Sequence, residues 1–478
     1  MYKFKTEPYE HQKDALKKCW NKESFAIFAE MGTGKTKIAL DNACILYNQG
    51  KIDRLLVVAP KGTYMTWVEQ EIPTHVPDYV EKNVLAWKST TSAKYRAELK
   101  NIIDLNDYRL KIMVINVEAL STKKGVEFAK LFLIGKAMMI VDESTTIKNP
   151  QAKRTKNILS LATEAKYRRI LTGSPVTQSP MDLWAQMDFL DPEILGQQSY
   201  YAFRTRYAVV ITANAAGGTH KYQKIVKFKN LAQLGQLVSP HSYRILKKDC
   251  LDLPDKVYTR REIELTDEQQ LAYKDMKANA MAFLKGESLT AVNVLTQLLR
   301  LHQITCGHMK TDSGETLNLK NNRLDELMQI LGETTGKVII WANYIHDILN
   351  IKNAIKKEYG EDSYCTYYGA TPADERQVCI RKFQDPESKI KFFIGNTQTG
   401  GYGITLTEAN TVIYYSNNYD LEKRLQSEDR AHRIGQKNSV LYIDMVAKGT
   451  VDDKIIKSLR NKVNIAKEIS GEELSKWI

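Results

Sequence analysis

The chain has 478 residues, of which 43% are hydrophobic and 26% are charged. At roughly 100–200 residues per domain, this length predicts two to four domains with cores of their own, and it excludes a small disulfide scaffold and a disordered tail. The 69 Lys and Arg residues outnumber the 56 Asp and Glu residues, which leaves a net charge of +13. Such a charge suggests an anionic partner, most often nucleic acid, although a basic surface can also serve solubility alone.

The first half of the chain predicts a parallel sheet covered by helices. Five short apolar runs, separated by connections long enough for helices, are predicted strands: Phe25–Ala29, Arg54–Ala59, Lys111–Asn116, Ala137–Asp142 and Arg168–Thr172. Between about residues 200 and 239 the composition turns polar and basic, with Gly217 and Gly218 as a break. This segment is either a hairpin insertion that faces an anionic partner or a solvated run of charge.

The second half of the chain repeats this pattern. Its predicted strands are Lys337–Ala342, Tyr364–Tyr368, Lys391–Gly395, Thr411–Ser416 and Val440–Val446. The repetition predicts two α/β lobes: residues 1–250, which include the insertion, and residues 261–478, which begin with helices and end in a C-terminal brace. A Leu-Pro-Asp sequence breaks the pattern between the lobes, so we place the linker at residues 251–260.

Cysteine usage and hydropathy favour a soluble protein in a reducing compartment. The six cysteines have no CxxC pair and no regular spacing, so they indicate neither a disulfide framework nor a zinc site. We interpret the loose cluster of His302, Cys306 and His308 as core or surface residues rather than metal ligands. There is no apolar signal core, and no stretch approaches the roughly 18 apolar residues of a membrane span. We therefore expect a soluble intracellular protein. From the short length of the chain we also expect the cytoplasm of a bacterium or of a virus-infected host cell.

A glycine-containing loop, AEMGTGKT, lies between the first predicted strand and a helical run. The residues predicted to contact a nucleotide are Gly32, Thr33, Gly34, Lys35 and Thr36. The glycines would let backbone N–H groups approach the phosphates, which the positive end of the helix would face. Lys35 would hold the β- and γ-phosphates and Thr36 would ligate magnesium. Ala29 stands in place of the first glycine of the usual pattern, so the alternative is a glycine-rich turn that arose by chance.

The fourth predicted strand ends in an acidic pair, Asp142 and Glu143. In an open parallel sheet, the carboxyl ends of the strands face the ligand crevice. Asp142 would order the hydrated magnesium there, and Glu143 would polarise the attacking water. Such a pair alone can simply open a loop or cap a helix. Together with the phosphate loop, it predicts a nucleotide hydrolase.

Two longer motifs follow the acidic pair. The first is LTGSP at Leu171–Pro175, continued by Asp182-Leu183-Trp184 and by Phe189–Leu195; the second is QSEDRAHRIGQ at Gln426–Gln436. They resemble the third and sixth motifs of helicase superfamily two, and specifically of the Swi/Snf-type DNA-dependent ATPases. The resemblance extends from near residue 8 to near residue 460. It implies a fold of two RecA-like parallel-sheet lobes in tandem with helical insertions.

The resemblance also implies an ATP site between the lobes, with ATP and Mg²⁺ as cofactors. Gln12 would contact the adenine base, and Gln426 would also contact the nucleotide. Arg430 and Arg433 would reach the phosphates from the second lobe, where a guanidinium can be worth about 10³–10⁵ in rate. The alternative for the two arginines is a surface ion-pair array with the neighbouring carboxylates.

The family's activity implies an ATP-dependent double-stranded DNA translocase that moves along the backbone as the lobes close and open. Lys61 and Thr397 would contact the DNA, and Thr172 and Ser174 would couple the state of ATP to the grip on DNA. Backbone contacts predict weak sequence preference and binding that falls steeply with salt. A groove lined by cations, among them Lys61 and the stretches 221–229 and 244–248, would hold the DNA.

Two points stay open in this interpretation. Thr145 stands where the family usually has a histidine that couples the ATP site to the third motif, so the strength of DNA-stimulated coupling is not predicted. The function itself has alternatives: a strand-separating or annealing, fork-remodelling helicase, the motor subunit of a restriction or defence assembly, or a scaffold that binds without turnover. The insertion, Tyr207–Lys229, is the only candidate for a strand-separating pin.

Overall fold

A computed structural model describes residues 2–89, 92–197, 199–214, 221–250, 252–286, 291–310, 315–400 and 404–470. Within it the chain forms two compact units. Most of the first unit is Met1–Tyr207 and Phe228–Asp252, and most of the second is Ala208–Lys227 and Leu253–Asn464. Gly217 and Gly218, the predicted break in the insertion, lie outside the described residues. The lobe boundaries given above remain a proposal.

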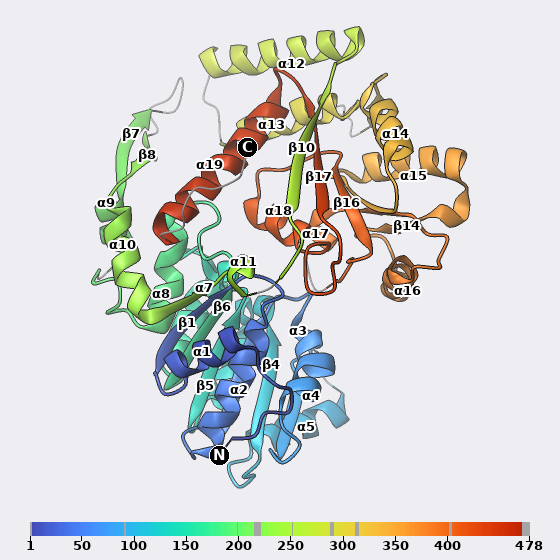
Figure 1. The fold of residues 1–478 in the computed structure, drawn as a ribbon. Helices are drawn as coiled ribbons and strands as arrows, with labels where there is room; N and C mark the ends of the chain where they lie inside the picture. The colour runs from blue at the N-terminus through green and yellow to red at the C-terminus, as the bar shows by residue number, and fades with distance from the viewer. Residues whose placement is uncertain are drawn as a thin grey trace. The chain divides into compact units, whose positions relative to one another are not determined.

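The first unit is built on a parallel sheet of seven strands in the order β3-β4-β2-β5-β6-β1-β9 (Figure 1). The strands are β1 Ser24–Ala29, β2 Arg54–Ala59, β3 Lys82–Ala86, β4 Leu110–Asn116, β5 Ala137–Asp142, β6 Tyr167–Thr172 and β9 Ser242–Ile245. The four central strands β2, β5, β6 and β1 are almost wholly buried, as their continuous apolar sequences predict. The order places the carboxyl ends of β1, β5 and β6 beside one another at one edge of the sheet.

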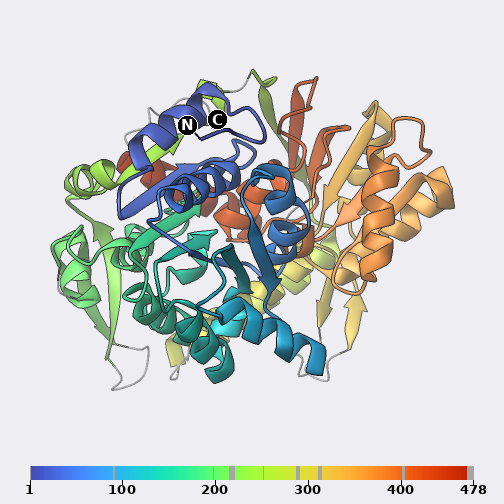
Figure 2. The same cartoon turned by 90° about the horizontal axis from the view of Figure 1, so that it is seen from below.

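Helices cover both faces of this first sheet (Figures 1 and 2). On one face, α1 and α2 share a core with alternate residues of β1, including Phe25 and Ile27. On the other face, α6 contacts β2, and α8 contacts β1 and β6. The helices of the unit are α1 Glu10–Cys19, α2 Lys35–Asn48, α3 Tyr64–Thr66, α4 Ile72–His75, α5 Ala93–Ile103, α6 Lys123–Phe132, α7 Lys153–Ala162, α8 Leu183–Leu190, α9 Tyr200–Tyr207, α10 Leu231–Val238 and α11 Lys247–Cys250.

The second unit has a parallel sheet of six strands in the order β10-β17-β16-β13-β15-β14. The strands are β10 Lys256–Ile263, β13 Lys337–Trp341, β14 Tyr364–Tyr367, β15 Phe392–Gly395, β16 Ala409–Tyr414 and β17 Val440–Ala447. Along β13, Val338 and Ile340 face α14 and α15, whereas Ile339 and Trp341 face α16. Period-two alternation thus fills a core on each face of the sheet. The predicted class, two RecA-like α/β lobes with parallel sheets, is confirmed.

The helices of the second unit are α12 Asp267–Gly286, α13 Ala291–Thr305, α14 Arg323–Glu333, α15 Ile345–Tyr359, α16 Ala373–Gln384, α17 Thr397–Gly400, α18 Leu421–Glu428 and α19 Val451–Ser470. Two small antiparallel pairs accompany the large sheets: β11 His308–Lys310 with β12 Thr316–Asn318, and β7 Ala208–Asn214 with β8 Lys221–Phe228. The β7–β8 pair lies in the predicted insertion, of which residues 215–220 are outside the description.

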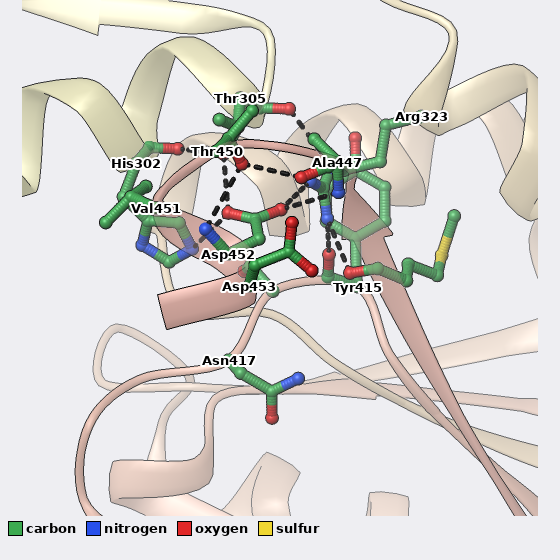
Figure 3. A network of polar contacts seen from close by, with 12 residues as sticks. His302, Thr305, Arg323, Tyr415, Asn417, Ala447, Thr450, Val451, Asp452 and Asp453 are labelled. Carbon is green, nitrogen blue, oxygen red and sulfur yellow. Dashed lines mark hydrogen bonds and ion pairs between the residues drawn. The ribbon is translucent and has the colours of Figure 1, made fainter. Parts of the chain in front are cut away.

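A buried ion pair holds the start of α19 against the second sheet (Figure 3). Arg323 of α14 is fully buried and donates to Asp452 of α19, and its other nitrogens donate to the backbone oxygens of Thr305, Tyr415 and Met445 at 2.5–3.0 Å. Asp452 also accepts from the Thr305 hydroxyl at 2.9 Å and from the Ala447 amide at 3.0 Å. Every one of these groups therefore has a partner within the unit.

Three strands of the two large sheets were not predicted from the sequence, and all three lie at sheet edges. β3 and β9 flank the first sheet, and β10 flanks the second, where it pairs with β17 from Lys256 to Ile263. The predicted linker at 251–260 therefore includes the beginning of a strand. An edge strand has one open side and one solvated face, so polar residues such as those of KVYTRREI break the apolar pattern.

The cysteines differ from expectation in one respect. Cys365 of β14 and Cys379 of α16 form a disulfide, although the sequence indicated no disulfide framework. The cysteines are 14 residues apart in sequence, but the strand and the helix bring their Cα atoms within 5.7 Å. Within the described residues, no cluster of three or more His, Cys, Asp or Glu is arranged to hold a metal ion. The described part of the chain also has no helix that combines the length and apolar character of a membrane span.

Candidate active site

The predicted phosphate loop joins β1 to α2 and requires glycine at two positions. Gly32 and Gly34 have φ angles of 84° and 82°, in the left-handed region that glycine adopts without strain. A Cβ atom on Gly34 would lie 2.2 Å from Nε2 of Gln12. That amide donates to the Thr33 carbonyl at 3.2 Å, and its Oε1 accepts from the Tyr9 amide at 3.0 Å. Gln12 therefore braces the loop, and its contact with a base remains a prediction.

The fold brings the phosphate loop and the acidic pair together. Lys35 begins α2, and its Nζ lies 3.1 Å from Oε1 of Glu143, just beyond the end of β5. Both side chains are only 10% exposed. Thr36, the predicted magnesium ligand, is half-buried in the first turn of the same helix. The expected proximity of these residues thus holds, while their roles remain to be tested.

Asp142 is buried at the end of β5 and has an unusual electrostatic environment. Burial, reinforced by the charge of Glu143, raises the pKa of Asp142 to about 6, although Lys35 and a hydrogen bond from Trp67 oppose the shift. The Trp67 indole donates to Oδ2 at 2.9 Å, and the Glu143 amide donates to Oδ1 at 3.0 Å. Trp67 is itself buried, so the hydrogen bond lies inside the first unit.

Glu143 has a strained backbone. Its φ of 46° and ψ of 62° lie in the left-handed region, which costs a non-glycine residue on the order of 1–2 kcal/mol. This conformation ends β5. The Glu143 carbonyl then accepts a hydrogen bond from the Thr146 amide, at 2.9 Å, in the short helix that follows. Strain of this kind persists only where surrounding contacts hold it, and it is concentrated at functional sites.

The third-motif loop lies against the phosphate loop because β6 pairs with β1. A Cβ atom on Gly173 would lie 3.4 Å from the Ala29 oxygen and from the Met31 nitrogen. Thr172 is buried, and its hydroxyl accepts from the Ser174 amide at 3.1 Å. The two predicted coupling residues therefore belong to one compact turn at the entrance of the nucleotide loop.

In the second unit, the predicted arginines lie beside the backbone of Ile404, which precedes β16. Arg430 is buried and donates to the Ile404 oxygen at 3.1 Å and to the Gln426 oxygen at 3.0 Å. Arg433 is half-exposed, and its contact with the Ile404 oxygen is longer, 3.4 Å. Gln426 is buried beside Glu422, and Thr397 is buried at the start of α17. The contacts of Thr397 with DNA and of the other three residues with nucleotide remain predictions.

The cations assigned to a DNA groove divide into two groups. Lys61 and Lys224 are exposed, as a backbone contact needs. Arg244 instead donates to the Phe28 and Gly173 carbonyls at 3.3 and 2.8 Å, and Lys247 is only 5% exposed. Including the stretch 244–248 as a whole in the groove was therefore wrong: β9 carries part of it into the first sheet.

The oxygen ligands at the end of β5 suit magnesium. Mg²⁺ prefers hard oxygen ligands, and the predicted ligands, the Asp142 carboxylate and the Thr36 hydroxyl, are of this kind. The raised pKa of Asp142 indicates that its charge lacks full compensation within the chain, which a cation would supply. These residues therefore fit the ion that the sequence predicts.

Comparison with known proteins gives two family matches that together cover most of the chain. The family described as SNF2-related domain matches residues 11–310, and the helicase conserved C-terminal domain matches residues 319–435. The "CHD3-type chromatin-remodeling factor CHR7" of Arabidopsis thaliana is 27% identical over 96% of this chain, and the "ATP-dependent helicase brm" of Drosophila melanogaster is 26% identical over 92%. The chain spans only 37% and 27% of these two relatives.

Among solved structures, the chain is similar to the "Sulfolobus solfataricus SWI2/SNF2 ATPase core in complex with dsDNA". The two are 25% identical, with a TM-score of 0.44, and the match covers 98% of this chain and 95% of the other.

Proposed function

The chain belongs to the SNF2-related family of helicase-like ATPases, and from this premise we propose that it is an ATP-dependent translocase on double-stranded DNA. The observation that carries the proposal is the 3.1 Å contact between Lys35 and Glu143, which joins the phosphate loop to the acidic pair within one unit. ATP is the substrate that the family implies. The two relatives are named a chromatin-remodeling factor and an ATP-dependent helicase, and action on DNA is for this chain part of the proposal.

In this mechanism Lys35 binds the phosphates, because an ammonium group can exchange its Glu143 partner for a phosphate oxygen. That exchange leaves the Glu143 carboxylate to accept a proton from the attacking water. Asp142 and Thr36 would hold Mg²⁺, which when bound neutralises phosphate charge. Arg433, half-exposed in the second unit, would stabilise charge on the transferring group, and Arg430 would hold the segment around it.

The track is proposed from charge. Between Glu193 and Asp249 the sequence has no Asp or Glu, while it carries nine Lys and Arg residues. A segment without carboxylates favours phosphate contacts with little sequence preference, which duplex DNA provides along its whole length. Exposed cations at Arg206, Lys224 and Lys227 belong to this segment.

The test is the rate of ATP hydrolysis measured without nucleic acid and with single-stranded DNA, duplex DNA or RNA. We expect the largest stimulation with duplex DNA, and we expect it to fall steeply with salt. Equal rates under all four conditions would overturn the DNA-dependent part of the proposal. Stimulation by RNA alone would indicate that the protein moves on RNA rather than on duplex DNA.

Strand separation is a second candidate function, because β7 and β8 form an antiparallel pair in the insertion, with Val209, Ile211 and Val226 exposed. Apolar side chains on such a pair could wedge between paired bases and separate them. A forked-duplex assay distinguishes the functions: ATP-dependent release of a strand favours the helicase, whereas displacement of a triplex strand without unwinding favours the translocase.

A further inference from the structure

A buried hydrogen-bonded bridge links the acidic pair to the third-motif loop. Ser144 follows Glu143, and its hydroxyl donates to Oε1 of Gln186 in α8 at 2.6 Å. The Gln186 Nε2 donates to the Pro175 carbonyl at 2.8 Å and to the Asp182 carbonyl at 2.7 Å. Ser144 and Gln186 are both fully buried. No pattern in the sequence indicates this bridge, because α8 meets the end of β5 only in the folded lobe.

Chemistry fixes the orientation of the Gln186 amide. Two carbonyl oxygens can be satisfied only by the NH₂ end of the side chain, so the oxygen end must face Ser144. The Ser144 hydroxyl can donate to that oxygen, whereas an alanine in its place could not. The bridge is therefore directional, with each end of Gln186 matched to one partner.

The bridge closes a ring of contacts around the nucleotide loop. Lys35 pairs with Glu143, whose neighbour Ser144 is held by Gln186, which in turn holds Pro175. Gly173 of the same turn lies against the backbone that enters the phosphate loop. These contacts link the loop, the acidic pair and the third-motif turn to one another.

Glu143 is the residue that most needs this support. Its left-handed backbone is strained, and its carboxylate must keep one direction to pair with Lys35 or to accept a proton. We propose that Ser144 and Gln186 are positioning residues that hold Glu143 in its productive conformation and couple it to the third-motif turn. The proposal rests on the proposed function, since it concerns the same hydrolytic site.

The first experiment measures hydrolysis by Ser144→Ala, Gln186→Met and the double variant, at saturating duplex DNA. We expect each single variant to lower kcat about tenfold while KM for ATP stays within twofold, because a positioning group acts on turnover rather than on binding. The double variant should lose little more than either single variant, since both break one link. Rates are expressed per molecule that binds a fluorescent ATP analogue, so that misfolded protein does not count.

Ser24→Ala is the matched control. The Ser24 hydroxyl donates to the Leu190 carbonyl at 2.5 Å in the same unit, at the opposite end of β1 from the phosphate loop. Ser24→Ala removes one side-chain hydrogen bond from the same unit, as Ser144→Ala does, but should leave kcat unchanged. Wild-type turnover in Ser144→Ala, or additive losses in the double variant, would overturn the proposal.

The second experiment tests the bridge without relying on hydrolysis. Amide hydrogen exchange is compared across the same variants over residues 143–147 and 172–177. We expect Gln186→Met to speed exchange at 143–147, and Ser144→Ala to speed exchange at 172–177, although neither substitution lies in the segment that responds. The coupling would be overturned if Ser144→Ala changed exchange only at 143–147 and Gln186→Met left exchange at 143–147 unchanged. A wild-type chain without hydrolysis would refute the proposed function, while this exchange result would still decide the bridge.

Discussion

The two units each bury a cluster of charged side chains, and the clusters differ in how well their charges are compensated. In the second unit, burial opposes the ionisation of Asp452, but Arg323 and several hydrogen bonds outweigh it, so the pKa of Asp452 lies below its usual value. In the first unit, burial raises the pKa of Asp142 to about 6 despite Lys35. The charge of Asp452 is thus stabilised by its neighbours, whereas the charge of Asp142 is only partly stabilised.

The backbone follows the same division. Glu143 is one of two non-glycine residues with positive φ among those described, and it belongs to the first cluster. The second cluster uses helix starts and strand ends in ordinary conformations. Strain and uncompensated charge lower stability, so a protein retains them where they serve binding or catalysis. The comparison thus distinguishes the Arg323–Asp452 pair from the proposed catalytic cluster without reference to motifs.

The largest expected effect breaks the first cluster. Glu143→Gln removes the proposed base and its charge while keeping its size, and we expect kcat to fall by about 10²–10⁴. Unfolding stability should stay level, because removing one of two adjacent carboxylates also relieves repulsion on Asp142. Steady-state hydrolysis and chemical denaturation measure the two effects. Glu127→Gln, at an exposed residue of α6, is the control; retained turnover in Glu143→Gln would assign the base elsewhere.

The second-largest effect is expected in the second unit, where a substitution should lower stability rather than turnover. Arg323→Met leaves Asp452 buried without its main partner, and we expect the free energy of unfolding of this unit to fall by about 3–5 kcal/mol. Denaturant unfolding followed by hydrogen exchange in α13 and α19 measures it. Turnover per folded molecule should change little. The half-exposed Arg261, which pairs with Glu326 and Glu333, provides the control: Arg261→Met should cost about 1 kcal/mol or less.

A smaller effect concerns acid stability. Because the pKa of Asp452 is lower in the folded than in the unfolded chain, its contribution is fully present above the usual Asp pKa and is lost as pH falls through the folded value. Asp452→Asn should therefore cost about 1.5–3 kcal/mol at pH 7 and less at low pH. Denaturation of the second unit between pH 7 and pH 3 measures the difference. A cost independent of pH would indicate that packing, rather than charge, explains the lowered stability.

Sequence reasoning succeeded where a signal is local. The central strands β2 and β5 were placed to the residue because buried parallel strands are continuously apolar. The glycine-containing loop between β1 and α2 was found because its two glycines separate an apolar run from a helical one. The edge strands β3, β9 and β10 were not predicted because polar residues interrupt the apolar pattern by which strands are recognised. Contacts that depend on packing between distant segments, such as Trp67 with Asp142, leave no pattern in the sequence.

Buried charge pairs are the clearest example of that limit. Arg323 and Asp452 are 129 residues apart in sequence, and each resembles an ordinary helix-surface residue when read alone. Arg244 was assigned to a DNA groove because it belongs to a basic run, yet β9 turns it toward backbone carbonyls. A sequence shows which residues are charged, but the burial of those residues depends on the order of the strands in the sheet. That order is not evident from the sequence pattern.

The smallest predicted effect sharpens the comparison within the first cluster. The Trp67 indole stabilises the ionised form of Asp142, so Trp67→Phe should raise the pKa of Asp142 above about 6. More of the chain would then carry a neutral Asp142 at pH 7, and kcat/KM for ATP should fall a few-fold there.

The deficit should shrink as pH rises, because a group with a raised pKa regains its charge at higher pH. The kcat/KM profile from pH 5.5 to 9 measures this shift, and Trp87→Phe, at a buried tryptophan after β3, is the matched control. A deficit that persists unchanged at pH 9 would mean that Trp67 acts by packing alone. The indole donates the side-chain hydrogen bond that opposes the raised pKa of Asp142. A shift of the kcat/KM profile in Trp67→Phe would therefore show that the charge of Asp142 is incompletely compensated. That property would distinguish this cluster from the Arg323–Asp452 pair.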